Sequence, residues 1–365
     1  MNYPIEEVWI AQDVANEPMT HRVLEKLGEK QVKVLRGTEV DAAMKRLLLE
    51  SDPLRRGKRI IRLLRYKGHA IRPCPGTRSY VCCNLQILHL GQGCPMDCKY
   101  CALQAYLNSP VLDVFANRDD LLADLEDYLT RRSDRFHRIC TGEFTDSLAL
   151  DPLTDIGRDL VGFFSTTKNA TLELKTKTDH IEALLDLDPK GRVIVSFSVN
   201  AEYVVRKEEL RSASLSNRLN AARQLEQRGY KLGFHFDPII PGPDWERSYL
   251  RTIQDIAACV HPENIVWISL GVLRFVPELK EVVLSRFGPL PYFHEAFIRG
   301  LDGKFRLYVD RRIQMYKALF QFIQSHIPKA RVYLCMESPY VWEQALGMHM
   351  PTSEALAEYL DEAVR

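Results

Sequence analysis

Three cysteines with a distinctive spacing, Cys94, Cys98 and Cys101, lie together in residues 93–101. Their spacing is C-x3-C-x2-C, and the aromatic residue Tyr100 comes directly before the last cysteine. Cysteine thiolates are the protein ligands of iron–sulfur clusters, and a cubane cluster has four irons. Three cysteines therefore leave one iron open to a substrate or a cofactor. The spacing predicts a [4Fe-4S] cluster that takes part in chemistry and does more than store electrons.

A zinc site is the alternative for these cysteines. Structural zinc usually takes four protein ligands, often as two CxxC pairs, and no second pair follows at such a distance. The other six cysteines show no disulfide-framework spacing, and the total of nine is odd. Reduced thiols in the cytoplasm are the expectation. These six are Cys74, Cys82, Cys83, Cys140, Cys259 and Cys335.

The composition of the 365-residue chain, 46% hydrophobic and 27% charged, is typical of a soluble globular protein. One large domain or two unequal domains are expected. No apolar stretch approaches the roughly 18 residues of a membrane span, and the first residues lack the basic-then-apolar order of a signal peptide. The net charge of +1 does not by itself predict a nucleic-acid partner.

A basic segment stands out against this neutral balance. Residues 45–72 hold ten Lys and Arg but only two acidic residues. Such a patch can neutralise DNA phosphates; the alternative is a solvated helix face whose apolar residues turn inward. The residues that would contact DNA are Arg55, Arg56, Lys58 and Arg59.

The pattern of apolar runs divides the chain into three parts. Residues 1–78 predict a small α/β unit, with strands near 8–10 and 32–35 around a helix near 21–27. Residues 79–300 alternate strands with helices, which predicts a parallel sheet, here a partial (β/α)6 TIM-like barrel. Residues 301–365 form a C-terminal extension of helices and one strand. The six barrel strands are expected at 86–90, 138–141, 171–175, 192–198, 231–237 and 265–270.

This order places the cysteines where such folds carry their sites, because the cysteine loop follows the first barrel strand and sites lie at the C-terminal ends of strands. Together with Tyr100, the loop resembles the signature of the radical S-adenosylmethionine (AdoMet) enzymes. Thr141-Gly142-Glu143, after the second strand, resembles the GGE element of that superfamily. A narrower resemblance, to the spore photoproduct lyase family, runs from about residue 80 to 285. It rests on residues 100–104, 140–141, 175–177, 196–205, 229–234 and 273–275.

The resemblance implies a DNA repair enzyme that reverses spore photoproduct, a thymine dimer joined through a methyl carbon. The cluster would cleave AdoMet to a 5′-deoxyadenosyl radical that removes a hydrogen atom from the lesion. Cys140 stands where the family has the cysteine that returns a hydrogen atom; the alternative is a small buried apolar residue at a strand end. Tyr100 would also act in catalysis. UV-damaged DNA and an electron donor such as flavodoxin or ferredoxin are the implied partners.

The same resemblance assigns residues to AdoMet and to the lesion. Gly142 and Glu143 would hold the methionine ammonium, since a carboxylate pairs well with such a group. Arg274 would face the lesion or a phosphate, with a salt-bridged barrel arginine as the alternative. For the remaining AdoMet contacts, polarity at the surface or the sheet edge is the alternative. These contacts are Lys177, Ser198 and Asn200.

One position departs from the family pattern. The family typically has tyrosines on both sides of the last cluster cysteine, which are thought to return the radical to the cofactor. Here Tyr100 is present, but Ala102 takes the second place. We therefore expect AdoMet to be consumed rather than recycled. The departure also favours one alternative, a radical AdoMet enzyme of the same group that acts on RNA or a small molecule. A separate alternative is a non-enzymatic iron–sulfur redox protein, although such a site normally has four protein ligands.

Overall fold

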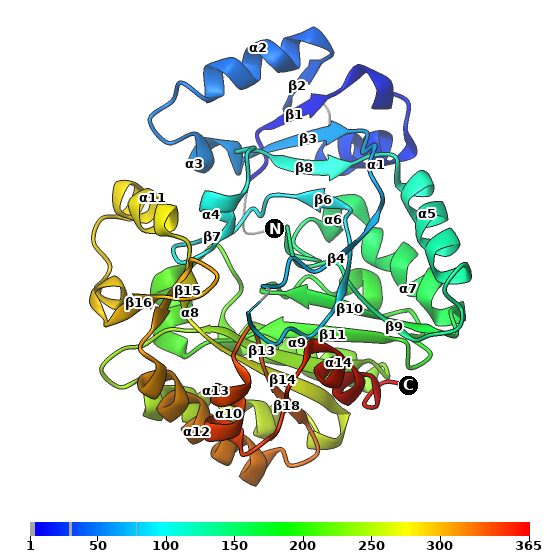
Figure 1. Cartoon of the computed structure of the whole chain (residues 1–365). Coiled ribbons are helices and arrows are strands. Elements are labelled where there is room, and N and C mark those ends of the chain that lie inside the picture. Colours follow the sequence, from blue (N-terminus) through cyan, green and yellow to red (C-terminus); the bar gives the residue numbers. More distant parts are fainter. Residues whose placement is uncertain (1–3, 29–30, 78) are drawn as a thin grey trace.

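The computed structural model describes residues 4–28, 31–77 and 79–365, and its largest feature is an eight-stranded sheet (Figure 1). Seven strands are parallel to their neighbours, and β4 at one edge is antiparallel to β5. The strand order is β18 (Arg331–Leu334), β14 (Ile265–Val272), β13 (Lys231–Ile239), β11 (Val193–Ser198), β10 (Ala170–Thr176), β9 (His137–Cys140), β5 (Gln86–Leu88) and β4 (Ile71–Pro73).

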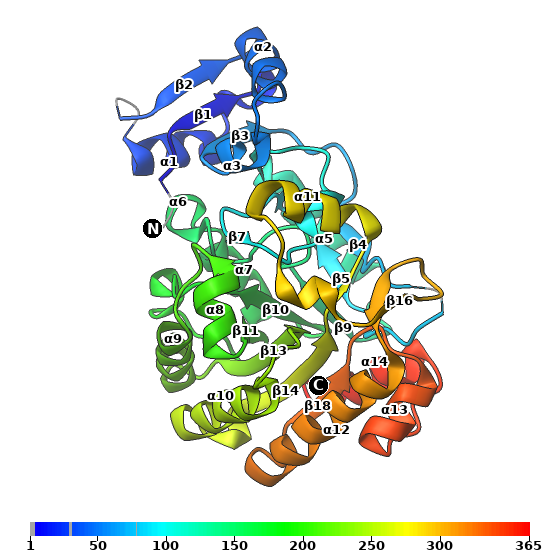
Figure 2. The same ribbon diagram turned by 90° about the vertical axis from the view of Figure 1, so that its left-hand side faces the viewer.

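The sheet curls into a partial barrel, as the sequence predicts. From β5 to β18 the order across the sheet follows the order along the chain, whereas a doubly wound sheet would reverse at a switch point. The helices therefore gather on the outer face (Figures 1 and 2). They are α5 (Arg118–Thr130), α7 (Ile156–Thr166), α9 (Leu215–Gln227), α10 (Trp245–Cys259) and α12 (Val309–His326).

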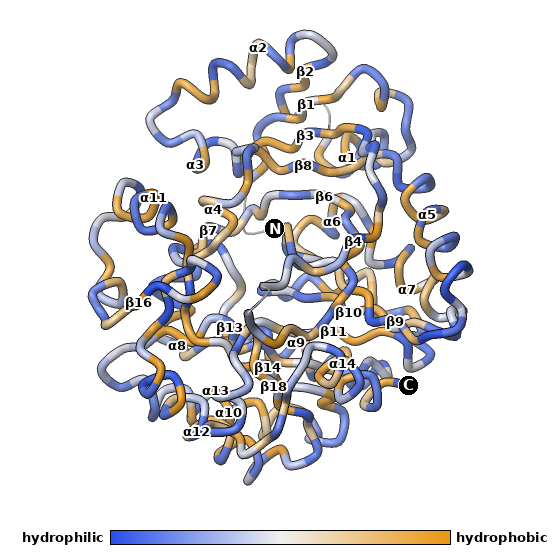
Figure 3. The backbone as a smooth tube through the Cα atoms, viewed as in Figure 1, coloured by the Kyte–Doolittle hydropathy of each residue, from blue (hydrophilic) through white to orange (hydrophobic). Residues whose placement is uncertain are grey.

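Burial explains why these runs become strands. The central strands are covered on both faces and therefore read as near-continuous apolar segments, such as Val193–Ser198, whose residues are buried except the last. In Figure 3 apolar, orange stretches occur in the barrel strands, with hydrophilic positions between them in strands such as β10. β18, predicted as part of the C-terminal extension, is the last parallel strand of the barrel. The chain beyond it returns to the opposite edge, where Val81 N–H donates to the Glu337 carbonyl at 2.8 Å.

A smaller sheet stands over one end of the barrel (Figure 1). Its order is β2 (Lys33–Arg36), β1 (Glu7–Ile10), β3 (Ile60–Leu64), β8 (Leu112–Phe115) and β6 (Gly91–Gln92). The helices α1 (Pro18–Leu27), α2 (Thr38–Leu47) and α3 (Pro53–Gly57) belong to the same unit. The last two strands follow residue 79, so the unit that begins the chain is completed by segments beyond the expected boundary at residue 78.

Short elements connect the two sheets and surround the mouth of the barrel. β7 (Asp97–Cys98), within the cysteine loop, pairs antiparallel with β12 (Glu209–Leu210). A three-stranded sheet contains β15 (Arg274–Phe275), β17 (Phe305–Leu307) and β16 (Phe297–Arg299). The remaining helices are α4 (Leu103–Tyr106), α6 (Asp151–Thr154), α8 (Glu202–Glu208), α11 (Pro277–Phe287), α13 (Pro339–Leu346) and α14 (Ser353–Asp361). In the described part of the chain, no helix has the length and apolar character needed to cross a membrane.

Candidate active site

A cavity of about 420 Å³ opens at the C-terminal ends of the barrel strands. The structure brings most of the predicted site residues to its wall, although they come from five separate segments of the chain. Cys140 and Asn200 are buried close by but do not line it. The predicted residues in the wall are Cys94, Cys98, Tyr100, Cys101, Gly142, Glu143, Lys177, Ser198 and Arg274.

The cysteine loop is held from outside by two buried cations. Lys58 Nζ donates to the carbonyl oxygens of Cys94, at 3.0 Å, and Met96, and lies 3.5 Å from the Asp97 carboxylate. Arg286 makes two hydrogen bonds of 3.0 Å to the same carboxylate. Because these contacts fix the backbone between the cysteines, the loop keeps its shape without relying on the thiols themselves.

The three thiols fit an iron–sulfur cluster better than a single metal ion. In the described ranges, no group of three or more His, Cys, Asp or Glu side chains is arranged to hold one ion. In a cubane each cysteine binds a different iron, so the thiols need only face a common space, as they do here. Burial raises the pKa of Cys94 to about 12 and that of Cys98 well above its usual value. Metal binding must therefore displace their protons.

Tyr100 is part of a buried polar chain behind the loop. Its hydroxyl donates to the Glu209 carboxylate, which also pairs with Arg218 at 2.6 Å and with Lys177 at 3.7 Å. Burial favours the protonated acid, but Arg218 and Lys177 outweigh it and lower the pKa of Glu209 to about 2. Glu209 is thus a fixed negative charge that positions both Tyr100 and Lys177.

Asn200 lies behind the cavity wall and does not line the cavity. It is fully buried, and its amide group donates to Glu209 Oε1 at 3.3 Å and to the Pro238 carbonyl at 3.0 Å. Ser198 does line the cavity, and its carbonyl accepts from Arg218 Nη1 at 2.8 Å. The expected AdoMet contact is therefore compatible with the position of Ser198, whereas Asn200 can act on a ligand only through its neighbours.

The segment after β9 needs a glycine beside the cavity. A Cβ on Gly142 would lie 2.7 Å from the Cβ of Lys175 and 3.1 Å from its carbonyl oxygen, so a larger residue would push the two strand ends apart. Asp146 secures this loop by accepting from the backbone N–H groups of Leu148, Ala149 and Lys177. The loop thus presents Gly142 and its neighbour Glu143 to the cavity.

Cys140 lies directly behind this glycine, at the end of β9. Its side chain has no solvent exposure, and its Sγ accepts from the Gly142 N–H at 3.4 Å. Burial raises the pKa of the Cys140 thiol to about 12. The group is therefore an S–H at neutral pH, the form that a hydrogen-atom donor requires.

Sequence reasoning missed a buried polar group under the cavity floor. Glu173 Oε1 accepts from Ser196 at 2.5 Å, from Trp267 at 2.9 Å and from His235 Nε2 at 2.8 Å. Lys175 Nζ lies 3.6 Å from the other oxygen of Glu173. Lys175 and His235 line the cavity. Polar residues in otherwise apolar strands were the available signal.

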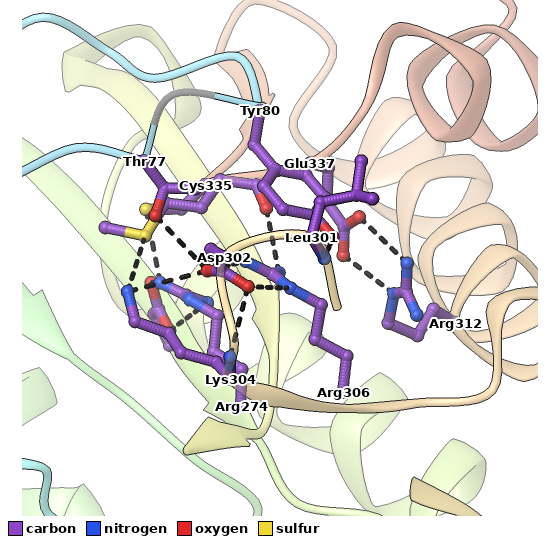
Figure 4. Close-up of polar contacts among 12 residues, drawn as sticks. Thr77, Tyr80, Arg274, Leu301, Asp302, Lys304, Arg306, Arg312, Cys335 and Glu337 are labelled. Carbon is purple, nitrogen blue, oxygen red and sulfur yellow. Dashed lines mark hydrogen bonds and ion pairs between the residues drawn. The ribbon is translucent and has the colours of Figure 1, made fainter. Parts of the chain in front are cut away.

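Arg274 and Lys304 form the basic end of the cavity (Figure 4). Arg274 makes two hydrogen bonds of 3.2 Å to the Asp237 carboxylate and lies 3.5 Å from Cys335 Sγ. It is thus a salt-bridged barrel arginine that also lines the cavity, and its contact with a lesion or a phosphate stays a prediction. Lys304, which the sequence analysis did not single out, contacts Met336 Sδ at 3.9 Å.

The turn that carries Lys304 is attached to the segment after β4. Asp302 accepts from Thr77 Oγ1 at 3.2 Å and from Arg306 Nη2 at 2.7 Å. The Arg306 guanidinium stacks 3.9 Å above the Tyr80 ring, and the Tyr80 hydroxyl accepts from the Leu301 N–H at 3.3 Å (Figure 4). The β16–β17 hairpin is therefore held firmly at the mouth of the cavity.

The basic residues expected to contact DNA do not line the cavity, and they differ from one another in burial and in ion pairing. Lys58 is buried against the cysteine loop, so it is not available to a phosphate. Arg56 pairs with Glu6 and with Glu7, the latter at 2.5 Å, and Arg59 pairs with Glu6. Arg55 is exposed, and no ion pair of its side chain is found in the described structure. DNA binding by this segment remains a prediction.

The partial barrel, with three cysteine thiols facing a cavity at the C-terminal strand ends, is an architecture of the radical AdoMet class. A model of the spore photoproduct lyase family matches residues 82–333. The chain therefore belongs to the spore photoproduct lyase family.

Individual relatives agree with this assignment. The chain is 33% identical over 204 residues to the spore photoproduct lyase of a Geobacillus strain, covering 54% of this chain and 59% of that protein. It is 26% identical over 250 residues to the Bacillus subtilis enzyme, covering 66% and 73%. The match to the Geobacillus protein thus spans less than two thirds of that protein's length.

Solved structures show the same fold. A spore photoproduct lyase complexed with dinucleoside spore photoproduct superposes with a TM-score of 0.82 at 24% identity, covering 92% of this chain and all of that one. A mutant lyase with bound AdoMet and the same dinucleoside gives 0.80, with the same identity and coverage. At this identity the likeness defines the fold alone.

Proposed function

We propose that this protein is a radical AdoMet lyase that repairs spore photoproduct in DNA. The observation that carries the proposal is the cavity itself. Its wall contains three cluster-type cysteines and the basic residues Arg274 and Lys304, and a buried thiol, Cys140, contacts Gly142 of the wall. Family membership and the relatives with bound dinucleoside spore photoproduct support this choice of substrate.

The residues of the wall divide into two groups. The cysteine loop, held by Lys58 and Arg286, would bind the cluster. Around the same space, Gly142, Glu143, Lys177 and Ser198 would bind AdoMet, with Glu143 facing its ammonium and Lys177 its carboxylate. When bound, the two cofactors supply a 5′-deoxyadenosyl radical able to take a hydrogen atom from the lesion.

Cys140 would complete the repair. After the bond between the two thymines has broken, one thymine carries a methylene radical. Cys140 gives this carbon its hydrogen atom, so that an S–H bond breaks, a C–H bond forms and the unpaired electron remains on sulfur. Tyr100, whose hydroxyl is held by Glu209, lies in the cavity wall. It would take part in passing the radical from the Cys140 sulfur back to the cofactor.

A second function has one observation in its favour. Ala102 occupies a wall position where the family typically has a tyrosine, so a radical return path used by the family is changed. A radical AdoMet enzyme of the same family that acts on RNA or a small molecule would also fit this change.

One anaerobic assay separates the two functions. The reconstituted and reduced protein is incubated with AdoMet and a thymine oligonucleotide that carries spore photoproduct, and restored thymine and 5′-deoxyadenosine are measured together. Restored thymine would support the lyase. Deoxyadenosine without repair would overturn the proposed substrate and retain radical chemistry.

A further inference from the structure

Arg211 lies beside the cysteine loop without a counterion of its own. It follows β12, in which Leu210 pairs in register with Asp97 of the loop. In the described structure, Arg211 Nη1 is buried and has no hydrogen-bond partner. Its backbone φ of 64° lies in the left-handed region, which is uncommon for a residue other than glycine and costs free energy. A guanidinium whose buried Nη1 has no partner marks a place where an anion would be stabilised.

The surrounding charges increase this preference. Burial lowers the pKa of Arg211, and Arg59, Arg55 and Arg286 lower it further, while Asp97 opposes them. The acidic groups of the region are already engaged: Asp97 and Asp52 pair with Arg286, and the glutamates at the start of β1 pair with Arg56 and Arg59. Arg211 and Arg55 form no ion pair with the described residues.

Two exposed apolar residues lie shortly before Arg55 in the chain. Leu48 is 55% exposed and Leu49 is 87% exposed, at the turn between α2 and α3. Lys45 and Arg46 are exposed just before them. Arginine beside exposed apolar side chains is typical of protein–protein contacts, whereas contacts to a DNA backbone use its phosphates and sugars and gain little from leucine. The composition of this surface therefore favours a protein partner.

We propose that this surface docks the protein that reduces the cluster, a small acidic one-electron carrier. The donor surface consists of Lys45, Arg46, Leu48, Leu49, Arg55 and Arg211. The carrier loses one electron, the cluster gains it, and no atoms are transferred. In Figures 1 and 2, α3 and β7 lie on the same side of the molecule. Arg211 directly follows Leu210, which pairs with Asp97 of the cysteine loop, so this end of the donor surface lies beside the loop.

The position leaves the substrate site free. None of the six residues of the donor surface lines the cavity, so carrier and substrate can be bound at the same time. The inference rests on the proposed cluster and not on the identity of the lesion. It would survive a failure to repair spore photoproduct.

The test compares two reductants on the reconstituted protein. In stopped-flow absorbance at low salt, we expect Arg55→Glu with Leu49→Ser to slow cluster reduction by photoreduced flavodoxin, an acidic flavoprotein, about tenfold. Reduction by dithionite, which needs no docking, should keep its wild-type rate. Fluorescence anisotropy of labelled flavodoxin should show about tenfold weaker binding, a difference that disappears at high salt.

A second variant and a matched control complete the design. Arg211→Gln should weaken flavodoxin binding in the same direction. Arg247→Gln with Arg251→Gln removes the same kind of charge from the exposed face of α10, and should change neither reaction. Wild-type flavodoxin affinity and reduction rate in both surface variants would overturn the inference. So would loss of duplex DNA binding with flavodoxin binding intact, because the surface would then be a DNA contact.

Discussion

Cys140 keeps its proton well above neutral pH because solvent does not reach its sulfur and burial raises its pKa to about 12. Replacing Cys140 by Ala should leave iron content and 5′-deoxyadenosine formation near wild-type. Cys140 is not one of the three loop cysteines that would bind the cluster, and its thiol contacts only the backbone N–H of Gly142 among the predicted AdoMet residues. Restored thymine should fall at least about tenfold, with other thymine products appearing, because the radical loses its hydrogen donor. Chromatography of the products checks both parts.

The raised pKa adds a condition to the same experiment. A thiol with its pKa raised stays protonated as pH rises past its ordinary value, so the wild-type fraction of correct product should stay flat between about pH 7 and 9. A fall centred near pH 8 to 9 would mean that another, exposed thiol donates the hydrogen atom. Loss of iron in Cys140→Ala would instead assign the residue to structure.

Ala102 leads to a prediction about the fate of AdoMet in the proposed reaction. Tyr100 remains in the wall, but its hydroxyl is held by Glu209 and the position after Cys101 offers no second phenol. We expect the wild-type protein to consume AdoMet in proportion to the lesions repaired. Ala102→Tyr should lower that consumption, with Ala102→Phe as the control that adds the ring without the hydroxyl. Near-zero consumption by the wild-type protein would contradict the prediction.

At the scale of elements, the β16–β17 hairpin holds one basic group at the mouth of the cavity. Lys304 is partly exposed there, 3.7 Å from Asp302. Lys304→Met should weaken binding of lesion-containing DNA and reduce the slope of log affinity against log salt by about 1, because one phosphate contact is lost. Lys317→Met, on the exposed side of α12, is the matched control. An unchanged slope would remove the hairpin from the DNA interface.

The barrel strands could be predicted because each strand's burial appears as a run of apolar residues in its own short segment of sequence. All six expected strands occur, and each end agrees with the structure to within two residues. Sheet membership was harder, because pairing joins distant segments. β8 and β6 complete the N-terminal sheet although they follow the first barrel strand. Nothing in Leu112–Phe115 itself distinguishes a strand of one sheet from a strand of the other.

The site shows the same division between local and distant information. The cysteine loop could be predicted from its spacing, and Gly142 from its place after a strand. The role of Lys58 could not, because a lysine in a basic run looks solvated until the loop that it supports is folded against it. The surroundings of Asn200 could not be predicted either: the family resemblance predicts an AdoMet contact there, which stays a prediction, and in the structure Glu209, Pro238 and Tyr249 use its amide.

At the scale of the whole molecule, the N-terminal unit and the barrel meet at the cysteine loop. Lys58 reaches the loop from the end of α3, and Arg286 reaches it from α11. Arg286 also bonds to Asp52, at the N-terminal end of α3, and to Gln104 of α4. Gln104 in turn donates to the Cys98 carbonyl at 2.5 Å. The packing of the two units and the shape of the cluster site therefore depend on the same few side chains.

Arg286→Met tests this dependence. Its guanidinium is almost fully buried between Asp52 and Asp97, and removing one partner of a buried ion pair leaves uncompensated charge. We expect the free energy of unfolding to fall by about 3 kcal/mol in urea titrations followed by circular dichroism. Iron bound per chain after reconstitution should fall with it, because Asp97 and Gln104 lose the group that aligns them.

Arg251→Met, which breaks an exposed pair with Asp255 on α10, is the control. It should lower the free energy of unfolding by less than about 1 kcal/mol and leave the iron content unchanged. A stable Arg286→Met protein with full iron would show that Lys58 alone holds the loop, and that the two units fold independently of the site they share.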